Sequence, residues 1–204
     1  MKRTFLIILV VCLVLGCGSS KKVSRIESKT ATQPETTTDL SSKWDNTDSR
    51  LVVREMMADC LSRAWIPAYV GVTGDKPVVT VGPVHNRTGE RIDVKNLITN
   101  FEKELKNSDQ INFIACQNQR DEISDEGQKE QEYASHETIR RIRAETGANF
   151  ILVGALKSIT DVTGGTKVAY YQTDLEMINT KTMAKVWAGT KRIKKEVFRK
   201  KTKS

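Results

Sequence analysis

The chain has 204 residues, of which 38% are hydrophobic and 28% charged, and this composition excludes a protein that is disordered throughout. It suits one globular domain with additional segments. The net charge of +8 lies mostly at one end, because Lys191–Ser204 carries eight Lys and Arg against one Glu. The predicted domain is therefore close to neutral, and residues 196–204 are expected to form a basic tail.

The first segment has the dimensions of a secretory signal. Met1–Arg3 is positively charged, and Phe5–Leu15 is an unbroken apolar run that is too short for a stable membrane span. The sequence Val14-Leu15-Gly16-Cys17 resembles the lipobox of bacterial lipoproteins, in which the cysteine becomes the acylated first residue. We expect residues 1–16 to be a signal peptide and Cys17 to be the lipid attachment site. The alternative is an ordinary signal peptide in which the cysteine is incidental.

Gly18 follows Cys17, where lipoproteins retained in the inner membrane of enteric bacteria carry Asp. This resemblance to sorted lipoproteins predicts a lipid-anchored protein in the outer membrane that faces the periplasm. A signal peptide takes the domain away from nucleic acid, so no nucleic-acid partner is expected. The basic tail could contact anionic lipid head groups or acidic cell-wall polymers, or it could be solvated without a partner.

Residues 17–44 are predicted to be the lipidated cysteine and a flexible tether. Gly18 to Lys43 is rich in Ser, Thr and Lys and has no apolar periodicity. A coil of this length spans about 28 Å on average. The globular domain is expected at residues 45–195.

The first half of the domain predicts a helix, a strand, a second helix and a second strand. The first helix carries a buried stripe and ends at Trp65-Ile66-Pro67, because a residue before proline avoids the α region. The stripe is Val53, Met56, Met57, Cys60, Leu61 and Ala64. The expected strand Lys76–Pro83 is followed by an exit loop, His85–Ile92. Asp93 caps the second helix, whose apolar positions are Val94, Leu97, Ile98, Phe101 and Leu105, and Ile111–Cys116 is a short strand.

The second half predicts a helix followed by three strands. Asp121–Glu132 is an acidic run expected to be solvated. A third helix is expected from Ser135 to Thr146 with Gly147 as its stop, and Phe150–Val153 is typical of a strand buried on both faces. An alternating strand from Ala169 to Met177 then turns at Asn179–Thr182 into an antiparallel strand, Met183–Thr190. The order α-β-α-β-α-β-β-β predicts an α/β (α+β) fold with a single mixed sheet packed with helices.

The sequence contains no recognisable catalytic constellation. His85 and His136 are its only histidines, and neither a metal-binding spacing nor a phosphate-binding loop is present. We therefore expect a protein that is not an enzyme and needs neither metal nor cofactor apart from the lipid on Cys17. Cys60 and Cys116 could pair in an oxidising compartment, but a helix face and a strand end are common places for buried free thiols.

The segment Pro77–Asp93, PVVTVGPVHNRTGERID, resembles the LpoB family of outer-membrane lipoproteins, which activate class A penicillin-binding proteins. The resemblance extends over about Leu51 to Lys195. It includes Ala64-Trp65-Ile66-Pro67, Glu145–Gly154, Tyr170-Tyr171-Gln172 and Val186-Trp187. The architecture resembles the N-terminal domain of TolB.

The resemblance implies a non-catalytic, monomeric regulator of peptidoglycan synthesis that docks on a class A penicillin-binding protein. Arg and Tyr are favoured at interface hot spots. We therefore predict a partner interface at Asn86, Arg87, Thr88, Glu90 and Tyr170. For Asn86 and Thr88 the competing interpretation is hydrogen bonding within a turn, for Arg87 it is a solvated charge, and for Tyr170 it is packing in the sheet.

The alternative function is a subunit of a secretion assembly similar to the curli exporter (CsgG-like). Such a subunit must contribute long alternating strands to a pore. Ala169–Met177 alternates in this way, but we expect the neighbouring strand to be broken by Asp161, Thr163 and Gly164-Gly165. A soluble sheet explains the alternation without a pore.

Overall fold

The computed structural model describes residues 35–37, 43–116, 133–163 and 166–198, all within one compact unit, Thr32–Ser204. The predicted signal peptide, Cys17, most of the predicted tether, the acidic run and residues 199–204 lie outside the described residues. The elements in chain order are β1 (Glu35–Thr37), α1 (Asn46–Leu61), α2 (Trp65–Thr73), β2 (Val78–Arg87), α3 (Val94–Lys106), β3 (Asn112–Phe113), α5 (His136–Thr146), β4 (Phe150–Thr163), β5 (Thr166–Asn179) and β6 (Lys185–Phe198).

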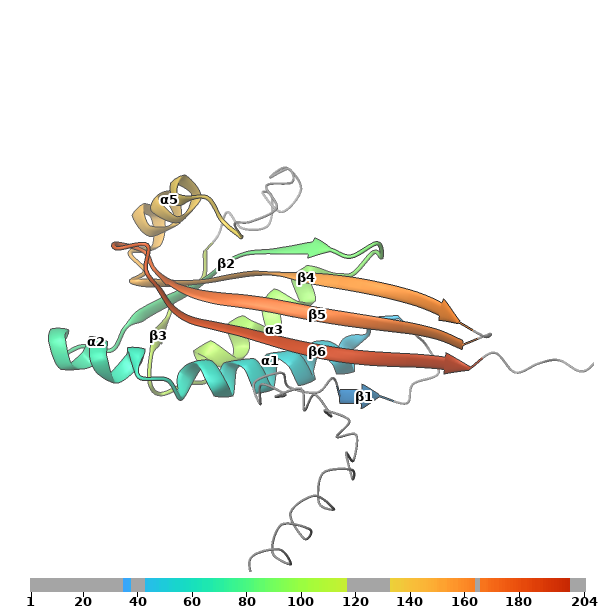
Figure 1. Cartoon of the computed structure of the whole chain (residues 1–204). Coiled ribbons are helices and arrows are strands. Elements are labelled where there is room, and N and C mark those ends of the chain that lie inside the picture. The colour runs from blue at the N-terminus through green and yellow to red at the C-terminus, as the bar shows by residue number, and fades with distance from the viewer. Residues whose placement is uncertain (1–34, 38–42, 117–132, 164–165, 199–204) are drawn as a thin grey trace, which may run out of the picture. The chain divides into compact units, whose positions relative to one another are not determined.

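The predicted single mixed sheet packed with helices is confirmed (Figure 1). Its strand order is β1-β6-β5-β4-β2-β3. The long strands β4, β5 and β6 form an antiparallel meander, whereas β2 runs parallel to both β3 and β4, and β1 runs parallel to β6. The predicted order α-β-α-β-α-β-β-β is present, and the structure adds β1 and α2 to it.

Helices α1 and α3 cover one face of the sheet and bury the main core between them and the strands (Figure 1). Both helices begin where a side chain satisfies the free N–H groups of the first turn. Asp45 and Asp48 form a capping box for α1, and the Asp93 carboxylate accepts from the Lys95 N–H at the start of α3. The predicted apolar stripe of α3 is buried throughout. Among the described residues, no helix is long and apolar enough to cross a membrane.

The predicted end of the first helix is wrong. Helix α1 ends at Leu61, and Trp65 begins the separate helix α2. Pro67 lies in the first turn of α2, where a missing N–H costs little because these groups have no partner within the helix. The ring of Trp65 packs on Phe150 at 4.8 Å and that of Tyr69 at 5.3 Å, so α2 closes one end of the core.

Strand β2 is longer than predicted, since His85, Asn86 and Arg87 belong to the strand and not to its exit loop. A shift of register between Val81 and Val84 carries the strand past Pro83, which has no N–H to donate to the ladder. Arg87 therefore lies opposite Lys157 of β4 and is held by the sheet.

Strand β4 begins as predicted, because Phe150 to Val153 are all at most 2% exposed. The expectation that Asp161 and Thr163 break this strand is wrong, and Gly164-Gly165, the third part of that expectation, lies outside the described residues. Asp161 pairs with Val168 of β5 and Thr163 pairs with Thr166, so the antiparallel ladder sustains the strand to its end.

Three short segments also differ from the predictions. Glu35–Thr37, within the expected flexible tether, forms β1 on the edge of β6, where unpaired backbone groups are available. The expected strand Ile111–Cys116 is reduced to Asn112–Phe113. Strand β6 continues to Phe198, so the expected basic tail begins within a strand.

Helix α5 confirms the predicted third helix. Ser135 caps its first turn, and Gly147 ends it with φ 70°, which favours glycine. On the sheet face opposite α1 and α3, α5 packs Ile139 and Ile142 against Ile151, Val153 and Ile178. These residues lie at one end of the strands, and the rest of this face has no helix over it among the described residues.

The cysteines of the domain lie in different apolar clusters. Cys60 belongs to the core beneath α1, and Cys116 belongs to the cluster beneath α5. Both are buried and neither is in a disulfide. Burial raises the pKa of the Cys60 thiol to about 12, so this thiol is uncharged.

Replacing Gly154 by alanine is expected to lower the free energy of unfolding by about 1–3 kcal/mol, the range for overpacking. A Cβ at this position would meet the carbonyl oxygen of Asp174 and the side chain of Leu175, and a backbone atom in a ladder cannot move aside freely. Gly71→Ala is the control, because nothing lies within 4 Å of its added Cβ. It lies inside α2, so alanine should stabilise the protein by about 0.5–1 kcal/mol. Urea unfolding measures both changes, and similar values would contradict this account.

Candidate docking surface

The loop that follows β2 is closed by its own side chains. The Asn86 Oδ1 atom accepts from the N–H of Thr88 at 3.0 Å and from its hydroxyl at 2.7 Å. Asn86 Nδ2 donates to the Glu90 carbonyl at 2.9 Å, and the Thr88 Oγ1 atom accepts from the Glu90 N–H at 3.1 Å. Asn86 and Thr88 therefore shape the loop through hydrogen bonds within the turn. This is the role that the sequence analysis gave as the alternative to a partner interface for these two residues.

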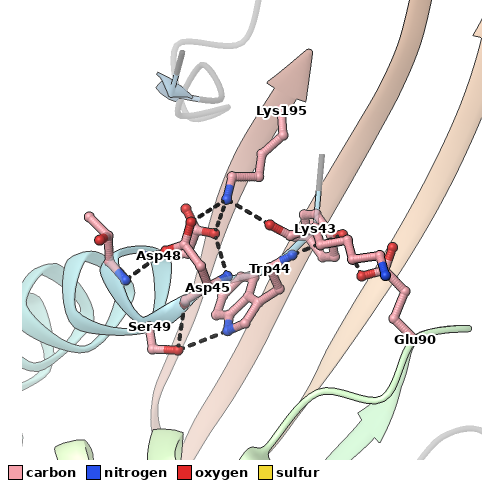
Figure 2. Close-up of polar contacts among 9 residues, drawn as sticks. Lys43, Trp44, Asp45, Asp48, Ser49, Glu90 and Lys195 are labelled. Atoms are coloured by element: carbon pink, nitrogen blue, oxygen red, sulfur yellow. Dashed lines mark hydrogen bonds and ion pairs between the residues drawn. The ribbon is translucent and has the colours of Figure 1, made fainter. Parts of the chain in front are cut away.

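Glu90 is bound to the helix-covered side of the sheet. The Tyr171 hydroxyl donates to Glu90 Oε2 at 2.8 Å and accepts from the Trp44 N–H at 3.2 Å (Figure 2). The rings of Trp44 and Tyr171 meet edge to face at 5.5 Å. The pKa of the Tyr171 hydroxyl is raised, mainly by burial and secondly by its hydrogen bond to Glu90. The loop, the residues before α1 and strand β5 are thereby joined.

Lys195 of β6 forms the second part of this junction (Figure 2). Its side chain is fully buried, and its Nζ atom donates to Asp45, to Asp48 and, at 2.8 Å, to the Lys43 carbonyl. Burial alone would lower the pKa of Lys195, but the hydrogen bonds to both carboxylates raise it. We call Lys195, Asp45, Asp48 and the Lys43 carbonyl the Lys195 cluster. It fixes the chain segment before α1 to the last strand.

The opposite face of the strands exposes an apolar pair. Ile159 of β4 lies directly across from Tyr170 of β5, and the two side chains are 74% and 39% exposed. Cross-strand partners share one face of a sheet, so the register places cations around this pair. Lys194 lies across from Tyr170, and Arg192 and Lys157 lie on either side of Gln172. A depression of about 480 Å³ is lined by Lys157, Ile159, Tyr170, Gln172 and Arg192, together with Ser158 and Tyr171.

We call this surface the open face; its residues are Arg87, Lys157, Ile159, Tyr170, Gln172, Asp174, Arg192 and Lys194. Several of its cations are held by ring contacts. The ammonium of Lys194 lies 5.9 Å from the centre of the Tyr170 ring. Arg87 and Lys157 lie 5.7 and 5.8 Å from the ring centre of Tyr133, which follows the undescribed segment.

A hydrogen-bond network around Asp174 holds the polar side chains in place. The carboxylate of Asp174 accepts from Lys157 at 3.0 Å, from Gln172 at 2.9 Å and from Thr190 at 2.8 Å. Gln172 in turn accepts from Arg192 Nε at 2.8 Å. Burial opposes the ionisation of Asp174, but the three donors outweigh it and lower its pKa. The hydrogen bonds around Asp174 thus order Lys157, Gln172 and Arg192 before a partner binds, which lowers the entropy cost of binding.

Asp174→Asn is expected to cost about 1.5–3 kcal/mol of unfolding free energy at neutral pH, the range for hydrogen bonds to a charged group. Because the pKa of Asp174 is lowered by folding, its contribution is present above the unfolded value of about 4 and is lost as the pH falls below it. Urea unfolding of both proteins at about pH 7 and about pH 3 measures the effect. If the difference in unfolding free energy between the two proteins does not shrink at the lower pH, the ionised Asp174 carboxylate is not what stabilises this network.

The sequence-predicted interface residues are divided between the two sides of the sheet. The structure brings Arg87 and Tyr170 to the open face, whereas Glu90 faces Tyr171 on the other side. Sequence reasoning missed Lys157, Ile159, Arg192 and Lys194. Their alternation along the strands was visible, but the register that gathers them was not.

The open face consists of apolar, cationic and hydrogen-bonded side chains, which are the groups that protein surfaces use for binding. Within the described ranges, no three His, Cys, Asp or Glu side chains are placed to hold a metal ion. Interfaces gain most of their affinity from aromatic and Arg anchors at the centre of a patch, and the open face has an exposed apolar pair with cations around it. Fold and surface together define a domain of the α+β class with an exposed apolar pair on an otherwise cationic sheet face.

The chain belongs to the LpoB family, whose description is peptidoglycan-synthase activator, because the family model matches residues 48–193. Members of this family regulate a synthase and are not themselves enzymes. No curated protein matches the chain.

Three solved structures illustrate what the chain is similar to. The C-terminal domain of LpoB from Salmonella enterica is 15% identical over 63% of this chain and 91% of that one, with a TM-score of 0.39. The same domain from Escherichia coli is 14% identical over 63% and 93%, with a TM-score of 0.39. Lipoprotein GNA1162 from Neisseria meningitidis is 10% identical over 59% and 83%, with a TM-score of 0.44.

Proposed function

We propose that this chain is a lipid-anchored outer-membrane lipoprotein whose open face docks on a class A penicillin-binding protein and activates it. The observation that carries the docking site is the exposed pair Ile159 and Tyr170 among fixed cations. Membership of a family of peptidoglycan-synthase activators supports the choice of partner. An apolar pair rimmed by cations suits a partner surface that is acidic around an apolar centre.

The anchor in this proposal is the lipid on Cys17, with residues 1–16 removed, residues 17–44 as the tether, residues 45–195 as the domain and residues 196–204 as the basic tail. The domain acts as a monomer, needs no cofactor and faces the periplasm. Intact mass spectrometry of the protein from its native membrane tests the anchor. The expected mass is that of an acylated chain beginning at Cys17, and an unacylated chain would count against it.

Activation by docking requires a synthase with at least two states. The domain raises the synthase rate only if it binds the active state more tightly than the inactive one. A rigid open face can bind the active state more tightly than the inactive state. A surface that adapted equally well to both states would not change the equilibrium between them. Binding and activation should therefore respond together to changes in Ile159 and Tyr170.

Titration of the full chain against purified class A penicillin-binding proteins of the same organism tests the docking. We expect saturable binding to at least one of them that weakens as salt is added, since cations surround the apolar pair. If none binds even at low salt, the proposed partner is wrong, and self-association of the chain becomes the next quantity to measure.

A further inference from the structure

We propose that the groove between α1 and α3 binds a phosphate group carried by a small, partly apolar ligand. The groove holds about 440 Å³ and is lined by Thr47, Arg50, Leu51, Val53, Arg54, Asn100, Lys103 and Glu104. This volume is within the range of about 300–1,000 Å³ that is usual for small-molecule sites.

The charge of the groove favours an anion. Arg50 and Arg54 are one turn apart on α1, and Lys103 faces them from α3, against the single carboxylate of Glu104. Among the described residues, none of these three cations lies within ion-pair distance of a carboxylate. This contrasts with Lys157, Lys191 and Lys195, each of which has an acidic partner. An anion between the two helices would relieve the repulsion among the three cations.

The arrangement favours phosphate over carboxylate. One guanidinium can satisfy a planar carboxylate through a single fork of two hydrogen bonds. Here two guanidinium groups and an ammonium approach from two helices, which suits a tetrahedral group with oxygens on several sides. Thr47 and Asn100 add uncharged donors, and the half-buried Leu51 adds apolar surface for the group that carries the phosphate, above the buried Val53.

This site is separate from the proposed docking function. Helices α1 and α3 cover the sheet face opposite the open face, so a ligand in the groove and a protein on the open face would not compete for space (Figure 1). A variant that loses phosphate binding should therefore still dock on the synthase. A variant that loses docking should likewise still bind phosphate.

Isothermal titration calorimetry of the full chain in detergent tests the proposal with three probes: inorganic phosphate, glycerol 3-phosphate and a short-chain phosphatidylglycerol. We expect saturable binding with one equivalent of ligand. Arg54→Gln and Lys103→Gln should each weaken it about tenfold, as expected when a charge-assisted hydrogen bond is lost. Lys106→Gln is the matched control, since Lys106 is exposed on the same helix but does not line the groove.

The probes also distinguish two sources of the phosphate. Binding of phosphatidylglycerol about tenfold tighter than glycerol 3-phosphate assigns the site to a phospholipid head group, whereas equal affinities assign it to a soluble phosphate ester. Absence of saturable binding by all three probes would overturn the proposal. So would equal weakening by Lys103→Gln and Lys106→Gln, because that result indicates only a diffuse attraction of anions to a basic surface.

Discussion

Replacing Lys195 by methionine is expected to lower the free energy of unfolding by about 3–5 kcal/mol, the cost of leaving a buried charge without its partner. Methionine fills most of the space of the lysine chain but leaves Asp48, which is fully buried, beside Asp45 with no cation. Burial already raises the pKa of Asp48 despite the hydrogen bond from Lys195. Urea unfolding measures the change.

Two further variants show whether the unpaired carboxylate causes the loss of stability in Lys195→Met. Lys195→Met combined with Asp48→Asn should recover part of the loss, because the buried carboxylate is then absent. Lys194→Met, at the neighbouring and more exposed position, should change stability by less than about 0.5 kcal/mol. The deficit of Lys195→Met should also shrink as the pH falls, since protonation neutralises Asp48. Equal effects at positions 194 and 195 would contradict the buried cluster.

Ile159→Asp and Tyr170→Ala are each expected to weaken binding to the synthase by about thirtyfold or more, as is typical of hot-spot residues. Ile159 is 74% exposed, so its change should lower the free energy of unfolding little. Tyr170 is 39% exposed and its ring contacts Lys194, so Tyr170→Ala should lower the free energy of unfolding more, and urea unfolding of both variants separates this loss from the loss of binding. An aspartate at position 159 also places a negative charge where an acidic partner would approach. Affinity titration of each variant against the synthase measures the loss.

Val72→Asp provides the matched control for the open face. Val72 is 88% exposed on α2, so it allows the same kind of substitution on a surface outside the proposed interface. We expect this variant to bind the synthase as the unaltered chain does. If Val72→Asp and Ile159→Asp weaken binding equally, the open face is not the docking surface.

The parts of the fold that local signals determine were predictable. Helices α3 and α5 begin and end close to the expected residues, because Asp93, Ser135 and Gly147 are capping residues whose effect is local. Strand lengths were not predictable in the same way. Strand β4 continues to Thr163 because β5 pairs with it along its whole length, and this pairing depends on a partner strand.

Only part of the site was predictable, because pairing between strands brings its other residues together. Arg87 and Tyr170 were selected for their chemistry, and the sheet brings both to the open face. The pairing of Ile159 with Tyr170 follows from the register of two strands, which alternation alone does not determine. Lys195 and Asp48 are 147 positions apart, so no local pattern could have joined them.

The rate of glycan-strand synthesis by the bound class A penicillin-binding protein tests the central claim most directly. The full chain should raise this rate in a saturable manner, Ile159→Asp should need a much higher concentration for the same increase, and Val72→Asp should match the unaltered chain. A synthase that binds the chain but polymerises glycan at an unchanged rate would contradict the claim that this protein is its activator.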